Sequence, residues 1–199
     1  LAAEAVQELE LAERIAQAEA ERKATEKMVA EGKGRNGVYQ IGDYYNRDSK
    51  EGVVFEVSAD GRHGKIVSLD EAKLEWCTDE QYDRAIVVGA LSKTDGKANT
   101  DRVMARSESD EYPAFVWCRD KGRDWYLPAN AELESIYAAE EKINVTIERL
   151  GKIKLGEIWW CYWSSTEYDE FCASIVGIYV GAPDFGKFNH YSVRAVSAF

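Results

Sequence analysis

The chain has 199 residues, which is enough for one domain of ordinary size with an appendage. Hydrophobic residues make up 45% of it and aromatic residues 12%, so it can fill a sizeable core and does not belong to the disordered class. A formal net charge of -11, with no stripe rich in Lys or Arg, argues against nucleic acid and anionic lipid as partners. There is no long apolar run, so no membrane span is predicted, and no signal-peptide pattern follows Leu1, so we expect any export signal to lie upstream.

Residues 1–31 are predicted to form one long helix. Strong helix formers dominate this stretch, and it contains neither Gly nor Pro. Its apolar residues follow two weak stripes, one of them interrupted by Arg22, so the pattern does not define a clean coiled coil. Two interpretations stay open, a helix in a trimeric stalk and a solvated tether. The glycines at 32, 34 and 37 predict a helix C-cap followed by a flexible turn.

The remainder of the chain reads as strands, then helices, then strands. Early strands are predicted at 38–41, 53–57, 64–69 and 85–90, with Asp60-Gly61 as the turn of a hairpin. Helices are predicted at 99–106, at 112–119, and from a first turn containing Pro128 to about Leu150, with Gly151 as the stop. Strands return at 159–166, 173–180 and 191–199. This order predicts an α+β fold and argues against a doubly wound parallel sheet.

Strong catalytic and cofactor motifs are absent from the sequence. The two histidines, His63 and His190, lie in no nucleophile motif, and neither a GxSxG elbow nor a Gly-rich phosphate loop is present. Asp169, Glu170 and Asp184 are too sparse for a calcium loop. The spacings of the four cysteines match neither CxxC nor a zinc ribbon, which favours buried small hydrophobes over a disulfide or a metal site. The sequence therefore predicts a protein that is not an enzyme and needs no cofactor or metal.

Three segments carry a resemblance to a known family. They read DWYLP at 124–128, YWSSTEY at 162–168 and VRAVSAF at 193–199. Together they resemble the C-type-lectin-like domain of bacterial and phage variable proteins, the targets of diversity-generating retroelements, and a broader group with a related but undiversified domain. The resemblance covers about residues 38–199. It implies a C-type-lectin-like ligand-binding domain over 35–199, preceded by a helical stalk and linker over 1–34.

The resemblance also implies a variable surface just before a constant C-terminal strand. Mutagenesis in this family acts on adenines of Asn codons, which cannot yield Glu, Gln, Lys, Met or Trp. Lys187 is the only member of that set between 171 and 192, although the five types make up nearly a quarter of the chain. Aromatic side chains among Gly and Pro in the same stretch indicate a contact surface. The alternative is an ordinary buried hairpin, because strands also favour aromatic and β-branched residues.

The candidate ligand-binding residues all lie between 161 and 191. They are Cys161, Asp169, Phe171, Cys172, Ser174, Ile175, Gly177, Tyr179, Val180, Ala182, Pro183, Asp184, Phe185, Phe188, Asn189, His190 and Tyr191. A loose alternation predicts that Ala173, Val176 and Ile178 face inward while Ser174, Ile175, Gly177 and Tyr179 face outward. Core packing is expected for Trp125, Trp163, Val193, Val196 and Phe199. For Arg194 an ion pair with Glu167 and an exposed position are both open.

Three functions compete on this evidence. The favoured one is attachment to a cell-surface protein or glycan, by an extracellular protein on a phage particle or bacterial surface that belongs to a larger fibre, pilus or surface assembly. A fixed-specificity adhesin or a calcium-dependent sugar-binding lectin is the second, although the EPN, QPD and WND elements of such lectins are missing. A formylglycine-generating-type oxidase, with Cys161 and Cys172 as its reactive pair, is the third.

Overall fold

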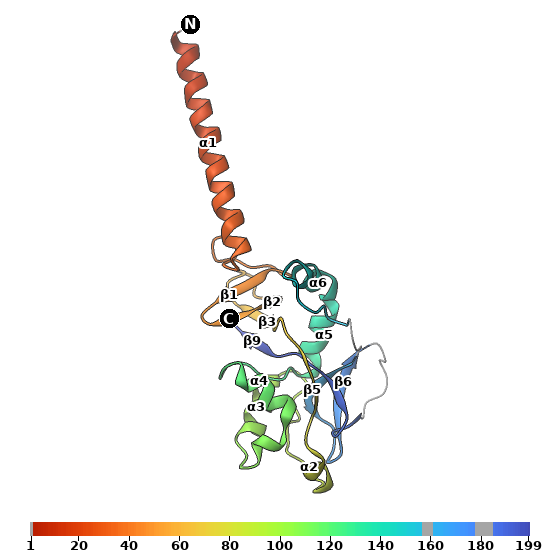
Figure 1. Ribbon diagram of the computed structural model, residues 1–199. Coiled ribbons are helices and arrows are strands. Elements are labelled where there is room, and N and C mark those ends of the chain that lie inside the picture. Colours follow the sequence, from red (N-terminus) through yellow and green to blue (C-terminus); the bar gives the residue numbers. More distant parts are fainter. Residues whose placement is uncertain (1, 157–160, 178–184) are drawn as a thin grey trace.

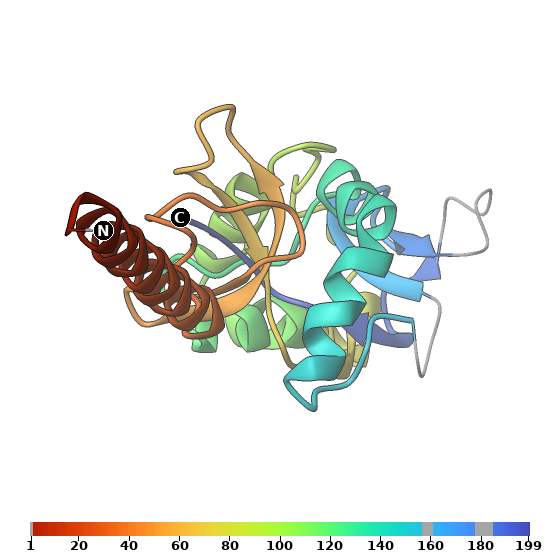
Figure 2. The ribbon, with the colours of Figure 1, turned by 90° about the horizontal axis from the view of Figure 1, so that it is seen from above.

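The computed structural model describes residues 2–156, 161–177 and 185–199. Helix α1 (Ala2–Ala30) projects away from the other elements, which pack together at its base (Figures 1 and 2). Nearly all side chains from 11 to 30 are exposed, and pairs such as Arg22 with Glu26 lie one turn apart along the helix. The predicted N-terminal helix is confirmed, and its surface is polar on nearly every side. No helix in the described ranges is long and apolar enough to cross a membrane.

The joint between α1 and the rest of the chain is built on Gly32. This residue has a left-handed φ of 76°, and the N–H of Lys33 donates to the carbonyl of Met28 at 2.9 Å, so the predicted C-cap is confirmed. The Gly32 carbonyl accepts hydrogen bonds from the Asn46 N–H at 2.9 Å and the Tyr39 hydroxyl at 3.1 Å. A Cβ at Gly32 would lie 2.6 Å from the Asn46 nitrogen. The segment after the helix is thus fastened to the domain, where the sequence predicted a flexible turn.

The first sheet has the strand order β1-β2-β3-β9 and is antiparallel throughout. Its strands are β1 (Tyr44–Arg47), β2 (Lys50–Val57), β3 (Gly64–Val67) and β9 (Val196–Ala198). The hairpin predicted at Asp60-Gly61 is confirmed as the β2–β3 connection. Residues 53–55 are buried on both faces of this sheet, which explains why β2 reads as a continuous apolar run.

The second sheet has the order β4-β8-β5-β6-β7 and contains one parallel pair, β5 with β8. Its strands are β4 (Ala72–Glu75), β5 (Cys161–Glu167), β6 (Cys172–Gly177), β7 (Phe185–Gly186) and β8 (His190–Val193). The single strand predicted at 191–199 is wrong. It divides at Arg194 and Ala195, so that β8 belongs to the second sheet and β9 to the first.

The helices between the strands are α2 (Asp79–Asp83), α3 (Gly96–Met104), η1 (Ser109–Glu111), α4 (Pro113–Asp120), α5 (Asn130–Ala138) and α6 (Glu140–Arg149). The predicted helices at 99–106 and 112–119 are confirmed as α3 and α4. The long helix predicted from Pro128 is wrong in two respects. It divides at Ala139, and it begins only after Pro128, whose carbonyl accepts the Ser165 N–H at 2.8 Å.

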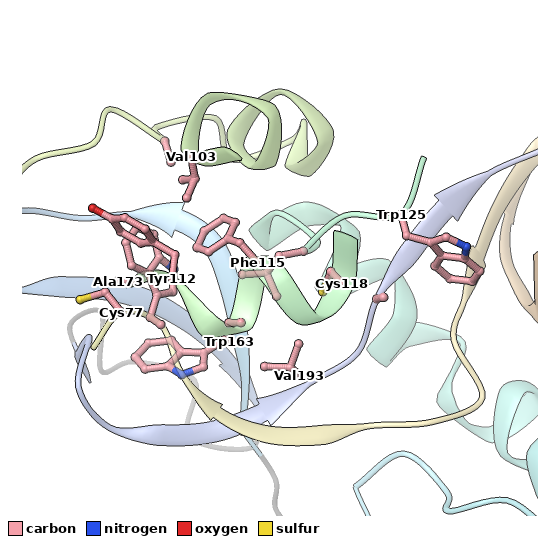
Figure 3. Packing of buried hydrophobic residues seen from close by; sticks show 14 of the residues in the cluster. Cys77, Val103, Tyr112, Phe115, Cys118, Trp125, Trp163, Ala173 and Val193 are labelled. Carbon is pink, nitrogen blue, oxygen red and sulfur yellow. The ribbon is translucent and has the colours of Figure 1, made fainter. Parts of the chain in front are cut away.

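Two clusters of buried side chains fill the space between these elements. The first core cluster surrounds Trp76, Phe115 and Trp163, and the second surrounds Phe55, Ile143 and Ile147. Figure 3 shows side chains of the first core cluster, among them Trp163 and Val193 from the second sheet, Phe115 from α4 and Tyr112 from the start of that helix. As predicted, the core includes Trp125, Trp163, Val193 and Val196, while Phe199 is half-buried and packs on the rings of Tyr39 and Tyr45.

The α+β prediction is confirmed, with an N-terminal helix and two mostly antiparallel sheets. Two of the early strand predictions are wrong. Residues 38–41 form a single bridge between Arg35 and Val38 in place of a strand, because the Arg35–Val38 turn reverses the chain through left-handed Asn36 and Gly37. Residues 85–90 form a loop, for a reason that lies in the neighbouring site.

Candidate ligand-binding surface

The predicted site residues lie on the β5–β6 hairpin and on the segment from β7 to β8. Phe171 (39%), Phe188 (41%) and His190 are exposed. Nine others are half-buried, namely Cys161, Asp169, Cys172, Ser174, Ile175, Gly177, Phe185, Asn189 and Tyr191. Tyr179, Val180, Ala182, Pro183 and Asp184 lie outside the described residues, and so does Ile178 of the predicted inward set.

The predicted alternation along β6 is partly wrong. Ala173 is buried as expected, but Ile175, predicted to face outward, pairs in register with Trp163 and packs against the first core cluster. Val176 pairs with Tyr162 and packs against the second cluster. Both faces of this strand therefore pack in part against core clusters, and most of its residues are half-buried. Strict alternation separates core from solvent only in a sheet with one fully wet face.

A group of three rings is the main feature of this surface, and we call it the aromatic patch; Phe171 and Phe188 are exposed, and Tyr82 is half-buried. It consists of Tyr82, Phe171 and Phe188, with ring centroids 5.4 Å apart for Tyr82–Phe171 and 4.8 Å apart for Tyr82–Phe188. Tyr82 comes from α2, which lies at the end of the molecule opposite α1 (Figure 1). Sequence reasoning missed Tyr82, because no local pattern links a tyrosine in a short acidic helix to rings about ninety positions later.

Two further predicted site residues, Phe185 and Tyr191, contribute to the core as well. Their ring centroids lie 5.5 Å apart, and Tyr191 contacts the buried ring of Trp163 edge-on at 4.9 Å. Both are half-buried and pack against the first core cluster. They therefore support the surface from beneath more than they extend it.

A buried ion pair lies under the surface and joins its loops. The Nζ of Lys187 is 2.7 Å from Oε1 of Glu167, and the two side chains are 1% and 0% exposed. The same Nζ donates to the carbonyls of Asp169 at 2.7 Å and Glu170 at 3.2 Å, and it lies 4.7 Å from the ring centre of Trp76. Such a pair is tolerable in the interior because all its hydrogen-bonding groups have partners. We call Lys187 and Glu167 the surface ion pair because they lie beneath the candidate surface, although both side chains are buried.

Glu167 also determines the path of residues 85–90. Its carboxylate accepts the backbone N–H groups of Val88 at 2.9 Å and Gly89 at 2.7 Å, and its own N–H donates to the Ala90 carbonyl at 2.7 Å. The segment leaves α2 through Ala85, which has a left-handed φ of 51°. Because these N–H groups donate to a carboxylate and not to the carbonyls of a neighbouring strand, residues 85–90 form a loop where a strand was predicted.

The remaining polar candidates shape the loops that carry the rings. Asp169 Oδ1 accepts the N–H groups of Phe171 at 2.8 Å and Cys172 at 2.7 Å, which is a turn typical of Asp. Asn189 Nδ2 donates to the Gly186 carbonyl at 2.9 Å. The exposed His190 lies 3.4 Å from the carboxylate of Glu75 on β4. Asp169 and Asn189 thus hold the backbone in place.

Arg194 forms an ion pair, but the partner suggested from the sequence is wrong. Glu167 is occupied by Lys187, and Arg194 Nε instead lies 3.1 Å from Oε2 of Glu71, just before β4. The guanidinium is 1% exposed and also donates to the carbonyls of Ser68 at 3.0 Å and Ile153 at 2.5 Å. We call Arg194 and Glu71 the crossing ion pair, because Arg194 lies where the chain passes from one sheet to the other.

The strand register separates the two cysteines that an oxidase interpretation requires. Cys161 pairs with Gly177 at one end of the hairpin, whereas Cys172 begins β6 at the other end. Five residues of strand place them about 16 Å apart along the hairpin. Burial raises the pKa of the Cys77 thiol to about 12 and raises the pKa of Cys118 as well. Among the described residues, no group of three or more His, Cys, Asp or Glu could hold a metal ion.

Comparison with known proteins adds a structural similarity. No family model matches the sequence, and no curated protein matches it. The chain is similar in structure to a fimbrial protein from Bacteroides ovatus, with a TM-score of 0.56 and 17% sequence identity. The likeness covers 81% of this chain but 49% of the fimbrial protein, so this chain spans about half of that protein's length. At this identity the comparison establishes a shared fold.

Proposed function

We propose that this chain is a non-catalytic ligand-binding protein of C-type-lectin-like fold, displayed on a bacterial or phage surface, and that its ligand contacts the aromatic patch and the exposed residues around it. We further propose that a diversity-generating retroelement varies the stretch between 161 and 191. The ligand class is a cell-surface protein or glycan. α1 would connect the binding domain to a fibre, pilus or other assembly.

The aromatic patch is the observation that supports ligand binding. Exposed aromatic rings that touch one another give a large, rigid contact area at a small entropic cost, and such side chains dominate binding energies at interfaces. The surface ion pair and the Asp169 turn hold the surrounding loops before any ligand arrives. Preorganisation of this kind reduces the free-energy cost of binding.

Lys187 supports the diversification part of the proposal. It is the one residue between 171 and 192 that mutagenesis of Asn codons cannot produce, and it is also buried in the surface ion pair. Phe171 and Phe188, which are exposed, are types that such mutagenesis can produce. The residue type that such mutagenesis cannot produce is thus buried, whereas Phe171 and Phe188, which it can produce, are exposed. This is the pattern expected if structural positions are constant and surface positions vary.

The structural similarity to a fimbrial protein supports a place in a surface assembly. The aromatic patch lies at the end of the molecule remote from α1 (Figure 1). A domain attached through α1 would therefore present its patch outward. Because α1 is polar on nearly every side, a solvated tether fits it at least as well as a trimeric stalk.

Two measurements test the proposal. The first is deep sequencing of the 3′ end of the gene in its source population. Substitutions should concentrate at codons 161–192, fall on adenine positions of a nearby template, and spare Lys187, Trp163 and codons 193–199. Uniform variation along the gene would refute diversification and leave a fixed-specificity adhesin.

The second measurement is binding of the labelled full chain to cells from the same habitat. The double variant Phe171→Ser/Phe188→Ser should lower binding at least tenfold, because hot-spot aromatics dominate such interfaces. The matched control is Val145→Ser, which removes an exposed apolar side chain (68% exposed) from α6. Equal binding by all three proteins would refute the aromatic patch as the binding site.

A further inference from the structure

The aromatic patch has a constant half that is strongly acidic. Tyr82 belongs to α2, and the same short helix carries the exposed carboxylates Asp79, Glu80 and Asp83. These residues lie about eighty positions before the stretch that is proposed to vary. Whatever side chains the variable stretch acquires, a ligand that reaches Tyr82 therefore meets the same acidic helix.

The neighbouring segment η1 adds further negative charge at this end of the molecule. The Thr78 N–H, at the start of α2, donates to the Glu111 carbonyl at 2.9 Å, and the Thr78 hydroxyl donates to the Glu111 carboxylate. Asp110, beside Glu111, is exposed. η1 is therefore joined to α2, the helix that carries Tyr82 of the aromatic patch, and we call Asp79, Glu80, Asp83 and Asp110 the acidic rim.

The cations that belong to the same segments do not neutralise this rim. Lys187 is buried and compensated by Glu167. Arg84 is the basic residue next to α2, and it lies 2.6 Å from Glu80 in an exposed pair that offsets one carboxylate. Asp79, Asp83 and Asp110 have no cationic partner among the ion pairs of the described residues.

We infer that the ligand is a polypeptide segment bearing Arg or Lys side chains, which insert between the aromatic patch and the acidic rim. This inference rests on the proposed function and specifies its ligand class. A guanidinium can stack on an aromatic face and at the same time donate to a carboxylate, so adjacent rings and carboxylates suit it on two counts. The carboxylates alone would mark only a solvated helix, and the exposed rings make the surface a docking site. Anionic glycans are disfavoured by repulsion, and a neutral glycan would lack the charge attraction to the rim.

The test uses the full chain and short synthetic peptides of alternating Ser and Arg, with binding measured by fluorescence anisotropy. A second peptide with citrulline in place of Arg keeps the shape and removes the charge. The Arg peptide should bind more tightly than the citrulline peptide, and its affinity should fall as salt is added. The triple variant Asp79→Asn/Glu80→Gln/Asp83→Asn should weaken it by about fivefold to thirtyfold, as three partly screened contacts predict.

A matched control changes the net charge by the same amount elsewhere. Glu134→Gln/Glu141→Gln/Glu148→Gln alters exposed residues of α5 and α6 and should leave the affinity unchanged. Equal affinity for the two peptides, or an equal loss in both triple variants, would overturn the inference. Circular dichroism of each variant separates loss of binding from loss of fold.

The same variants distinguish failure of the inference from failure of the proposed function. If Phe171→Ser/Phe188→Ser abolishes cell binding while the α2 triple variant does not affect it, the patch is a binding site for an uncharged ligand and the inference is wrong. If neither variant affects cell binding, the proposed function is wrong and the inference falls with it.

Discussion

The crossing ion pair and the surface ion pair use the same chemistry in two regions of the molecule. Arg194 reaches Ser68, just after β3 of the first sheet, Glu71, just before β4 of the second sheet, and Ile153, in the segment after α6. Lys187 instead reaches Glu167 and two carbonyls of one short turn. The crossing ion pair therefore fixes how the sheets are joined, and the surface ion pair fixes the shape of the face above it. The consequence of a buried charge depends on how far apart in the chain its partners lie.

The largest effect is expected for Arg194→Met. This change leaves Glu71 buried without its cation and releases two carbonyls, so the free energy of unfolding should fall by about 4 kcal/mol. Denaturation in urea measures it. The double variant Glu71→Gln/Arg194→Met should recover part of the loss, because it removes the uncompensated charge. A loss below about 1 kcal/mol would mean that the crossing ion pair does not join the sheets.

A smaller and more local effect is expected for Lys187→Met. We expect a loss of about 3 kcal/mol, since one partner of a buried pair is removed while Glu167 keeps its two backbone donors. Hydrogen exchange should accelerate in residues 85–91 and 168–171 and stay unchanged in β2 and β3. Equal acceleration throughout the chain would show that the two ion pairs have the same role and would remove the contrast between them.

The smallest effect is expected for Tyr162→Phe, which probes the crossing ion pair through pH. The Tyr162 hydroxyl donates to Glu71 at 2.8 Å, and burial, followed by the Glu71 charge, raises the pKa of Tyr162 from 10.0 to about 12. The folded pKa is raised, so the stabilisation is complete below pH 10 and is lost as pH rises toward 12.

At neutral pH the Phe variant should lose about 1 to 2 kcal/mol, because the hydroxyl donates one hydrogen bond to Glu71 and accepts another from the Gly156 N–H at 3.2 Å. Its stability should then fall less steeply than that of the parent between pH 10 and 12. Thermal melts across this range measure both quantities. Tyr168→Phe, at an exposed ring (57%), is the control and should match the parent. Parallel pH profiles for the parent and Tyr162→Phe would contradict the assigned role.

The sequence predicted those elements whose signals are local. The N-terminal helix and its stop at Gly32 follow from helix formers and a left-handed glycine, and the β2–β3 hairpin follows from Asp60-Gly61. The buried positions Trp125, Trp163 and Val193 were also predictable, because large apolar residues in strands and turns are seldom exposed. Each of these signals acts over a few residues.

The tertiary structure decided what depends on distant partners. Arg194 and Glu71 are 123 positions apart, so the sequence suggested the nearer Glu167 as a partner. The outward prediction for Ile175 failed because both faces of β6 meet a core cluster, with Ile175 packing against the first and Val176 against the second, which no two-residue repeat reveals. Tyr82 belongs to the aromatic patch because α2 packs against the region from β6 to β8 in the folded chain. Local propensity determines the helices and strands, but long-range packing and ion pairing determine which side chains come into contact. The proposed binding surface consists of side chains that are distant in the sequence and are brought together in this way.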